Sequence, residues 1–500
     1  MPFLKPTINM LAIDTSKIWD LFIYSPKEPI LFSSAFFLVL FVGFISIYFF
    51  IHKHHRLKTT FVTLFSLYFY YKSSGIYFLI LIGSTVVDYL LANLIFRTQD
   101  KTFKRIILII SLILNLGLLA YFKYTNFLLE IIHSISNQPF TPESIFLPVG
   151  VSFFTFQSLS YTIDIYRGKL KPVDNIFDYA FFVSFFPQLV AGPIVRAVDF
   201  IPQLYKPVQI TNQMIGRAVF LICSGLVKKT IIADYISINF VDRIFDNPTL
   251  YSGFENLIGV YGYSLQIYCD FSGYSDMAIG IALLLGFHFP INFDSSYQSK
   301  NITEFWRRWH ISLSTWLKDY VYISLGGNRK GKYRTYFNLF ITMLIGGLWH
   351  GAGFRFILWG AMHGIALVIH KIYLSFFPSN EKKRWYISLF SWIVTFHFVC
   401  FCWIYFRAEN MKVAGEVIHQ IANNFHGKIA FEFISGYPVV SVLLVIGYFL
   451  HFIPKKIELK TETLITKSPL ILQIFYVIIV VFMMVQFKSA EIQPFIYFQF

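Results

Sequence analysis

Charge is scarce in this sequence of 500 residues, because Asp, Glu, Lys and Arg together make up only 14% of it. Soluble domains usually carry about 25%. Hydrophobic residues reach 56% and aromatic residues 20%, which is more apolar surface than a soluble core can bury. The composition excludes an ordinary soluble protein and predicts an all-α polytopic membrane protein that is surrounded by a lipid bilayer.

Cysteine is also rare. The chain has four cysteines, Cys223, Cys269, Cys400 and Cys402, which lie in or beside apolar runs and form no CxxC pair. We therefore expect buried free thiols rather than a metal site. No Walker-type phosphate loop and no GxSxG nucleophile elbow occurs in the sequence.

Long apolar runs dominate the chain, and about 20 such residues suffice to span a bilayer. We expect about a dozen crossings, with Phe254–Phe287 broken or bent because polar residues lie in its middle. The candidate runs are Pro29–Ile51, Leu57–Tyr71, Ile76–Phe96, Ile106–Ile131, Ser144–Tyr166, Phe177–Phe200, Met214–Ile236, Phe254–Phe287, Tyr336–His350, Phe354–Tyr373, Ile387–Phe406, Pro438–Phe452 and Leu470–Phe487.

Basic residues gather in loops that we place on the cytoplasmic side, because Lys and Arg favour cytoplasmic loops. These loops are His52–Lys58, Arg97–Arg105, Arg167–Lys171, Asn328–Arg334, Asn380–Arg384 and Pro454–Lys460. They account for the net charge of +15, so that no nucleic-acid partner is implied. The loops between them, such as Ser134–Glu143 and Glu409–Tyr437, then face outward.

Polar clusters interrupt three of the apolar regions. The first is Tyr268–Phe293, in which Asp270, Ser272 and Asp276 lie in an otherwise apolar stretch, with Ser272 and Asp276 on one helix face. The simpler interpretation is a structural network satisfied by neighbouring helices. The alternative is a functional site, since ionisable groups at membrane depth are costly.

The second cluster is the amphipathic stretch Asn301–Gly331, where tryptophans and charged residues alternate. Its members are Trp306, Arg307, Arg308, Trp309, His310, Trp316, Lys318 and Asp319. One interpretation is a helix at the membrane–water interface, which favours Trp and basic residues. The other is the wall of a donor site, in which Arg and Lys meet a phosphate of the donor.

The third cluster is "GGLWHGAGFRF", Gly346–Phe356, which contains Trp349 and His350. A helix from Tyr336 to His350 would rise about 22 Å out of a basic loop, against a hydrocarbon core of about 30 Å. His350 should therefore stop inside the membrane, where Gly351 and Gly353 end the helix. Irregular backbone at this depth requires a protein interior or a wet cavity. A histidine there can carry a proton, act as a nucleophile or be structural, and its spacing to other residues does not favour a metal.

Five stretches together resemble the membrane-bound O-acyltransferase family, in particular the bacterial alginate and peptidoglycan O-acetyltransferase membrane subunits. They appear in the family's order: "PVGVSFFTFQSLSYTIDIYRG" (Pro148–Gly168), "FFPQLVAGPIVR" (Phe185–Arg196), "YCDFSGYSDMAIGIALLLGF" (Tyr268–Phe287), "FWRRWHISLSTWLKDYVYISLGGNRKG" (Phe305–Gly331) and "GGLWHGAGFRFILWGAMHG" (Gly346–Gly364). The resemblance implies one membrane domain over residues 1–500, with a motif core at 148–364. It also implies a ring of tilted helices around a thin core with a tunnel.

The resemblance further implies that His350 is the essential histidine and His310 the second one. It favours acetyl over D-alanyl transfer, because D-alanyl transferases of the family are usually shorter and lack "YISLGGNRKG". The expected donor is acetyl-CoA on the cytoplasmic side of the bacterial inner membrane, with no bound cofactor. The expected product is an O-acetylated polysaccharide, peptidoglycan first and an alginate-like polymer second. Because no outward loop is long enough to grip a polymer, we expect a separate periplasmic O-acetyltransferase as a partner. A transporter or flippase is the alternative class.

Overall fold

The structure, a computed structural model, describes residues 19–26, 28–190, 192–377, 384–487 and 495–496. Within these ranges the chain is helical and contains no strand, which confirms the all-α prediction. The helices are α2 (Ala35–Ile51), α3 (His55–Ser74), α4 (Phe78–Arg97), α5 (Lys101–Ile135), α6 (Val151–Tyr166), α7 (Ile176–Ser184), α8 (Phe186–Leu189), α9 (Ala197–Leu204), α10 (Asn212–Leu226), α11 (Asp234–Ile236), α12 (Asp242–Asp246), α13 (Gly253–Leu284), α14 (Ile302–Arg308), α15 (Ile311–Trp316), α16 (Lys332–His350), α17 (Phe354–Phe376), α18 (Trp385–Arg407), α19 (Met411–Asn423), α20 (Ala430–Gly436), α21 (Pro438–Phe452), α22 (Lys455–Thr466) and α23 (Leu470–Phe487).

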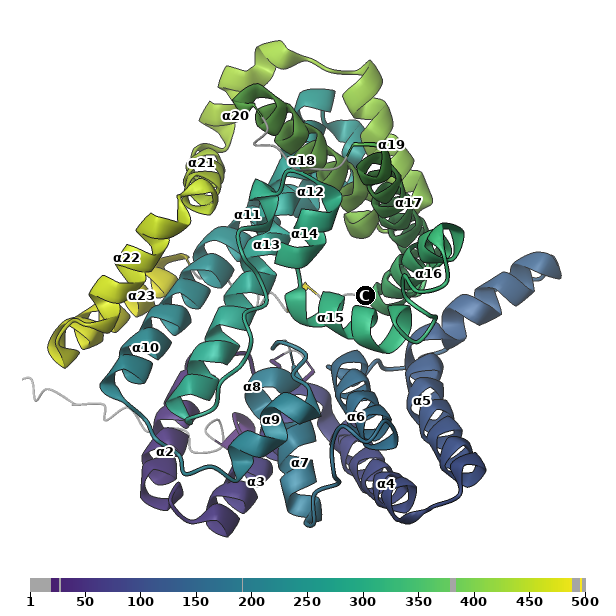
Figure 1. Ribbon diagram of the computed structural model, residues 1–500. Coiled ribbons are helices and arrows are strands. Elements are labelled where there is room, and N and C mark those ends of the chain that lie inside the picture. Colours follow the sequence, from purple (N-terminus) through teal and green to yellow (C-terminus); the bar gives the residue numbers. More distant parts are fainter. Residues whose placement is uncertain (1–18, 27, 191, 378–383, 488–494, 497–500) are drawn as a thin grey trace, which may run out of the picture.

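The short helix α15 lies near the middle of the molecule, between two larger groups of helices. In Figure 1, α2 to α9 fill the lower part of the view and α17 to α21 the upper part. Helices α10, α22 and α23 pack beside one another at the left, and α16 and α17 at the right. The position of α15 places the residues around His310 in the interior, away from the outer surface.

Five stretches of the described chain are long and apolar enough to cross a membrane: His55–Arg97, Lys101–Ile135, Phe354–Phe376, Trp385–Arg407 and Leu470–Phe487. A sixth crossing would be the bent pair Gly427–Gly436 and Pro438–Phe452, which turns by 104°. The chain is thus a multi-pass membrane protein, but fewer helices reach full span length than the dozen predicted. The reason is that runs such as Phe177–Phe200 are divided into short helices, here α7, α8 and α9.

The predicted break in Phe254–Phe287 is wrong, because α13 runs without interruption for 32 residues. A break would be needed only if its carboxylates lacked partners, and both have them: Lys229 pairs with Asp270 and Lys228 with Asp276. Both lysines lie in a π-helical segment, Val227–Ala233, that follows α10. The irregular helical geometry therefore lies in the run predicted as Met214–Ile236, which contains this π-helical segment.

The interface-helix interpretation of Asn301–Gly331 is also wrong. The segment is broken between α14 and α15, and its Trp306, Trp309 and Trp316 are buried. An interfacial helix would leave its tryptophans at the surface. The break falls at His310, which has a left-handed backbone with φ 41°. This conformation is uncommon for a residue with a side chain and turns the following helix in a new direction.

The prediction for His350 is confirmed in its local structure, since α16 ends at this residue and α17 begins at Phe354. The two helices pack backbone against backbone. A Cβ atom on Gly347 would lie 2.3 Å from the Phe356 carbonyl oxygen, and one on Gly360 would lie 2.6 Å from that of Met343. Only glycine permits this approach, which brings the start of α17 against the end of α16.

Candidate active site

His350 lies at the C-terminal end of α16 with only 2% of its surface exposed. Its ring packs against Trp349, Trp359 and Phe406, at centroid distances of 5.1, 4.9 and 5.2 Å. These rings come from α16, α17 and α18. Three helices thus form an aromatic pocket around the imidazole and shield it from the outer surface of the protein.

A lysine from α5 fixes the end of α16. Lys123 Nζ donates to the carbonyl oxygens of Trp349 and His350, both at 2.8 Å. Its neighbour Tyr124 donates its hydroxyl to the Leu348 carbonyl at 2.5 Å. The last carbonyls of a helix have no partner within the helix and carry partial negative charge, so that a cation is favourable there. Lys123 therefore holds the backbone from which the His350 ring projects.

His310 is fully buried and enters the same region from the α14–α15 break. Its left-handed backbone costs about 1–3 kcal/mol and persists only where the surroundings fix it. Here Asn292 does so, because its carbonyl accepts from Ile311 N at 2.9 Å and its side-chain oxygen accepts from Ser312 Oγ at 2.9 Å. Such strain at a buried histidine indicates a position that the fold maintains for function.

The two predicted histidines come together at Trp349. The Trp349 ring centroid lies 6.0 Å from that of His310 and 5.1 Å from that of His350. Phe271, from the middle of α13, packs on His310 at 4.5 Å. Phe271 also contacts Phe495, at 5.2 Å, so that a residue near the C-terminus lies beside this pocket.

A third histidine, His363 of α17, was missed by the sequence reasoning. It is fully buried and accepts a hydrogen bond from Trp306 Nε1 at 3.3 Å through Nδ1. Trp359 packs on both His363 and His350, at 4.6 and 4.9 Å. The available signal was a histidine inside the apolar run Phe354–Tyr373, which also contains His370. Lys123 gave a similar signal within Ile106–Ile131.

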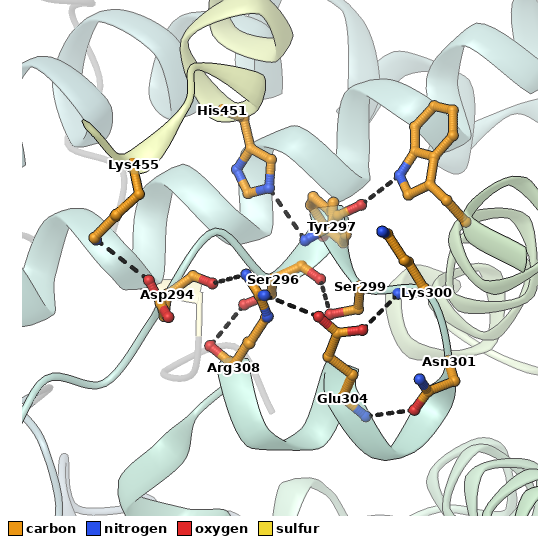
Figure 2. A network of polar contacts seen from close by, with 11 residues as sticks. Asp294, Ser296, Tyr297, Ser299, Lys300, Asn301, Glu304, Arg308, His451 and Lys455 are labelled. Atoms are coloured by element: carbon orange, nitrogen blue, oxygen red, sulfur yellow. Dashed lines mark hydrogen bonds and ion pairs between the residues drawn. The ribbon is translucent and has the colours of Figure 1, made fainter. Parts of the chain in front are cut away.

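The charged residues predicted for the donor site take part in separate contacts. Arg307 is exposed, and Arg308 pairs with Glu304 at 2.8 Å. The Arg308 carbonyl also accepts from Ser296 Oγ at 2.8 Å within the polar network of Figure 2. In the same network Asp294 meets Lys455 at 3.2 Å, which ties the α13–α14 loop to α22.

Lys318 and Asp319 lie farther along the chain, in a π-helical segment, Leu317–Tyr322, that follows α15. Lys318 is exposed, and Asp319 pairs with Arg196 rather than with Arg307 or Arg308. The predicted cations therefore do not share one set of contacts.

The polar residues of α13 support the structural interpretation. Asp270 accepts from Lys229 at 2.6 Å and from Ile496 N at 2.8 Å, and Asp276 pairs with Lys228 at 2.7 Å. Ser272 is buried, and its hydroxyl has no hydrogen-bond partner within the described ranges. The four cysteines are buried and free, as expected. Among the residues that the structure describes, no three His, Cys, Asp or Glu side chains gather as metal ligands.

Replacement of Lys123 by methionine is expected to lower the rate of the reaction that depends on His350 about 10- to 100-fold. A small misplacement of a catalytic side chain, here the His350 imidazole, has effects of this size. The change removes the donor to two carbonyls and frees the end of α16 to shift. The rate would be measured in membrane vesicles, alongside the thermal stability of the purified protein. The exposed Lys101, at the start of the same helix, supplies the control Lys101→Met. Equal rates for both variants and the unmodified chain would contradict the role of Lys123.

Comparison with known proteins gives consistent results. The model of the membrane-bound O-acyltransferase family matches residues 173–411. The probable alginate O-acetylase of Pseudomonas aeruginosa is 44% identical, covering 77% of this chain and 73% of that protein. The peptidoglycan O-acetyltransferase of Helicobacter pylori is 40% identical, over 78% of this chain and 79% of that protein. The teichoic acid D-alanyltransferase of Bacillus subtilis is 30% identical, over 54% of this chain and 70% of that protein.

Proposed function

Because this chain belongs to the membrane-bound O-acyltransferase family and is thus an acyltransferase, we propose that it transfers acetyl from acetyl-CoA. The donor lies on the cytoplasmic side of a bacterial inner membrane, and the acetyl group leaves for O-acetylation of a polysaccharide outside. The observation that carries the proposal is the convergence of His310 and His350 on Trp349 inside an aromatic pocket. Acetyl is favoured because the O-acetylating relatives are 40% and 44% identical, against 30% for the D-alanyltransferase.

The reaction needs a group that handles one proton. In the proposed step a hydroxyl oxygen attacks the thioester carbonyl, a C–O bond forms, and the C–S bond breaks. His350 takes the hydroxyl proton as a general base, and the leaving thiolate ends as the free thiol of CoA. In the alternative the imidazole first accepts the acetyl group and then passes it to the hydroxyl. A buried aromatic pocket that already holds the base in place supports either route, because little reorganisation is then required.

The acceptor polymer and the partner follow from the same reasoning. The relatives named for alginate and for peptidoglycan are 44% and 40% identical, which does not separate the two polymers, and we keep peptidoglycan as the first choice and an alginate-like polymer as the second. A separate periplasmic O-acetyltransferase would take the acetyl group to the sugar. A transporter finds no support among these relatives, which are named as acetylases, acetyltransferases or D-alanyltransferases.

Vesicles with the cytoplasmic face outward, given radiolabelled acetyl-CoA, are expected to label an acceptor inside only when this chain and its partner are both present. In a second experiment, ester-linked acetate would be measured on the peptidoglycan and on the exopolysaccharide of a strain that lacks this chain. We expect the acetate content of the peptidoglycan to decrease. Labelling without this chain would contradict the proposed transfer. Direct labelling of polymer by this chain alone would contradict the need for a partner.

A further inference from the structure

Two arginines meet over one tyrosine, and one of them, Arg167, begins the basic loop Arg167–Lys171. The guanidinium of Arg167, after α6, lies 5.3 Å from the Tyr320 ring centroid, and that of Arg196, before α9, lies 5.7 Å from it. Arg196 also pairs with Asp319, and Arg167 donates to the Asp319 carbonyl at 3.2 Å and to Ser324 Oγ at 2.9 Å. We name Arg167, Arg196, Asp319 and Tyr320 the arginine–tyrosine cluster.

The surroundings of this cluster carry surplus positive charge. Lys169 and Lys318 stand beside it with exposed fractions of 57% and 59%. The carboxylates in contact with these groups are Asp164 and Asp319, so that four cations face two anions. Arginine has five N–H donors in a planar fork that matches a phosphate, and the contacts above use only part of that set. The cluster is therefore suited to an anion that arrives from the cytoplasm.

A file of aromatic rings connects the cluster to the histidines. The ring of Tyr320 packs on Trp316 at 4.9 Å, Trp316 stacks on Phe156 at 3.8 Å, and Phe156 stacks on Trp349 at 5.4 Å. Trp349 in turn contacts His350 at 5.1 Å. Trp316 Nε1 donates to the Phe156 carbonyl at 3.0 Å, which fixes the middle of the file. These four aromatic side chains are buried and in contact, so they form one continuous apolar row from the charged surface to the pocket, which we name the aromatic wall.

We propose that Arg167 and Arg196 bind the phosphate groups of the acyl donor, while its thioester arm follows this aromatic wall to the histidines. The inference rests on the proposed function and deepens it. It moves the donor-phosphate contact from Arg307 and Arg308 to a pair that is physically joined to the pocket. Asp319 keeps Arg196 oriented, and the remaining guanidinium N–H groups receive the phosphate.

The test compares two ligands that differ in their phosphates. Coenzyme A carries them, and pantetheine has the same thiol arm without them. In the purified full-length chain, Arg167→Gln and Arg196→Gln are each expected to weaken coenzyme A binding about 10- to 100-fold, as for a lost charge-assisted hydrogen bond. Pantetheine binding should stay unchanged in both variants. Inorganic pyrophosphate should compete with coenzyme A for the unmodified chain.

The control is Arg329→Gln, which removes the same charge from an exposed position of the neighbouring basic loop. Its coenzyme A affinity should stay within about twofold of the unmodified chain, since surface charges contribute little. If both cluster variants bind coenzyme A as tightly as Arg329→Gln does, or if pyrophosphate fails to compete, the inference is wrong and the proposed function stands. If the unmodified chain binds no coenzyme A, both are wrong. Loss of pantetheine binding in one variant would indicate damage to the fold of that variant. The coenzyme A affinity of the other arginine variant then decides whether the inference holds.

Discussion

Replacement of His350 by alanine is expected to lower the rate of acetyl transfer about 10²- to 10⁴-fold, the usual loss for a general acid–base group. The cavity left in the ring of Trp349, Trp359 and Phe406 should weaken packing only locally. Coenzyme A binding should remain nearly unchanged, because the proposed phosphate contacts lie at the far end of the aromatic wall. Transfer in vesicles and coenzyme A binding would be measured separately at matched protein levels. Full activity of this variant would refute the role of His350.

The matched variant is His310→Asn, because asparagine tolerates the left-handed backbone at φ 41° that alanine would strain. We expect this variant to raise the KM for acetyl-CoA more than it lowers kcat, since His310 belongs to the Asn301–Gly331 stretch that the sequence predicts as a wall of the donor site. His350→Ala should lower kcat with little change in KM. If His350→Ala loses donor binding and His310→Asn keeps it, the assignment of the two histidines is reversed.

Replacement of Lys229 by methionine is expected to destabilise the protein by about 3–5 kcal/mol, the cost of leaving buried charges without their partner. Lys229 is 2% exposed at its side chain and bridges Asp270 at 2.6 Å and Asp234 at 2.7 Å. Its loss would leave Asp270, whose side chain is 4% exposed, without the Lys229 cation, and Asp234 at the start of α11 would lose the same partner. The thermal unfolding of the purified variant in detergent would measure this effect.

The neighbouring lysine gives a close control. Lys228 pairs with Asp276, but these side chains are 28% and 21% exposed, so Lys228→Met should cost clearly less. Adding Asp270→Asn to Lys229→Met should recover part of the lost stability, because one uncompensated charge is then removed. Equal melting of Lys229→Met and Lys228→Met would show that burial does not govern this network.

Local patterns predicted the parts of the site that depend on nearby residues. The end of α16 at His350 and the reversal before Phe354 followed from an apolar run that meets glycines. Where the prediction failed, the missing information was a distant partner. The carboxylates in the middle of α13 are paired by Lys228 and Lys229, which lie in the π-helical segment Val227–Ala233. The break at His310 depends on Asn292, whose contacts no periodicity in the sequence reveals.

The sequence by itself determined the membrane class, the all-α fold and the family, and it singled out two of the histidines that the candidate site brings together. Each of these depends on composition or on contiguous motifs, which are properties of neighbouring residues. Only the tertiary structure decided that Trp349 joins His310 to His350, that Lys123 holds a helix end 227 residues away, and that Arg196 meets Tyr320. The physical reason is that such contacts arise when helices pack, and the free energy of packing belongs to the whole bundle rather than to any segment of the chain.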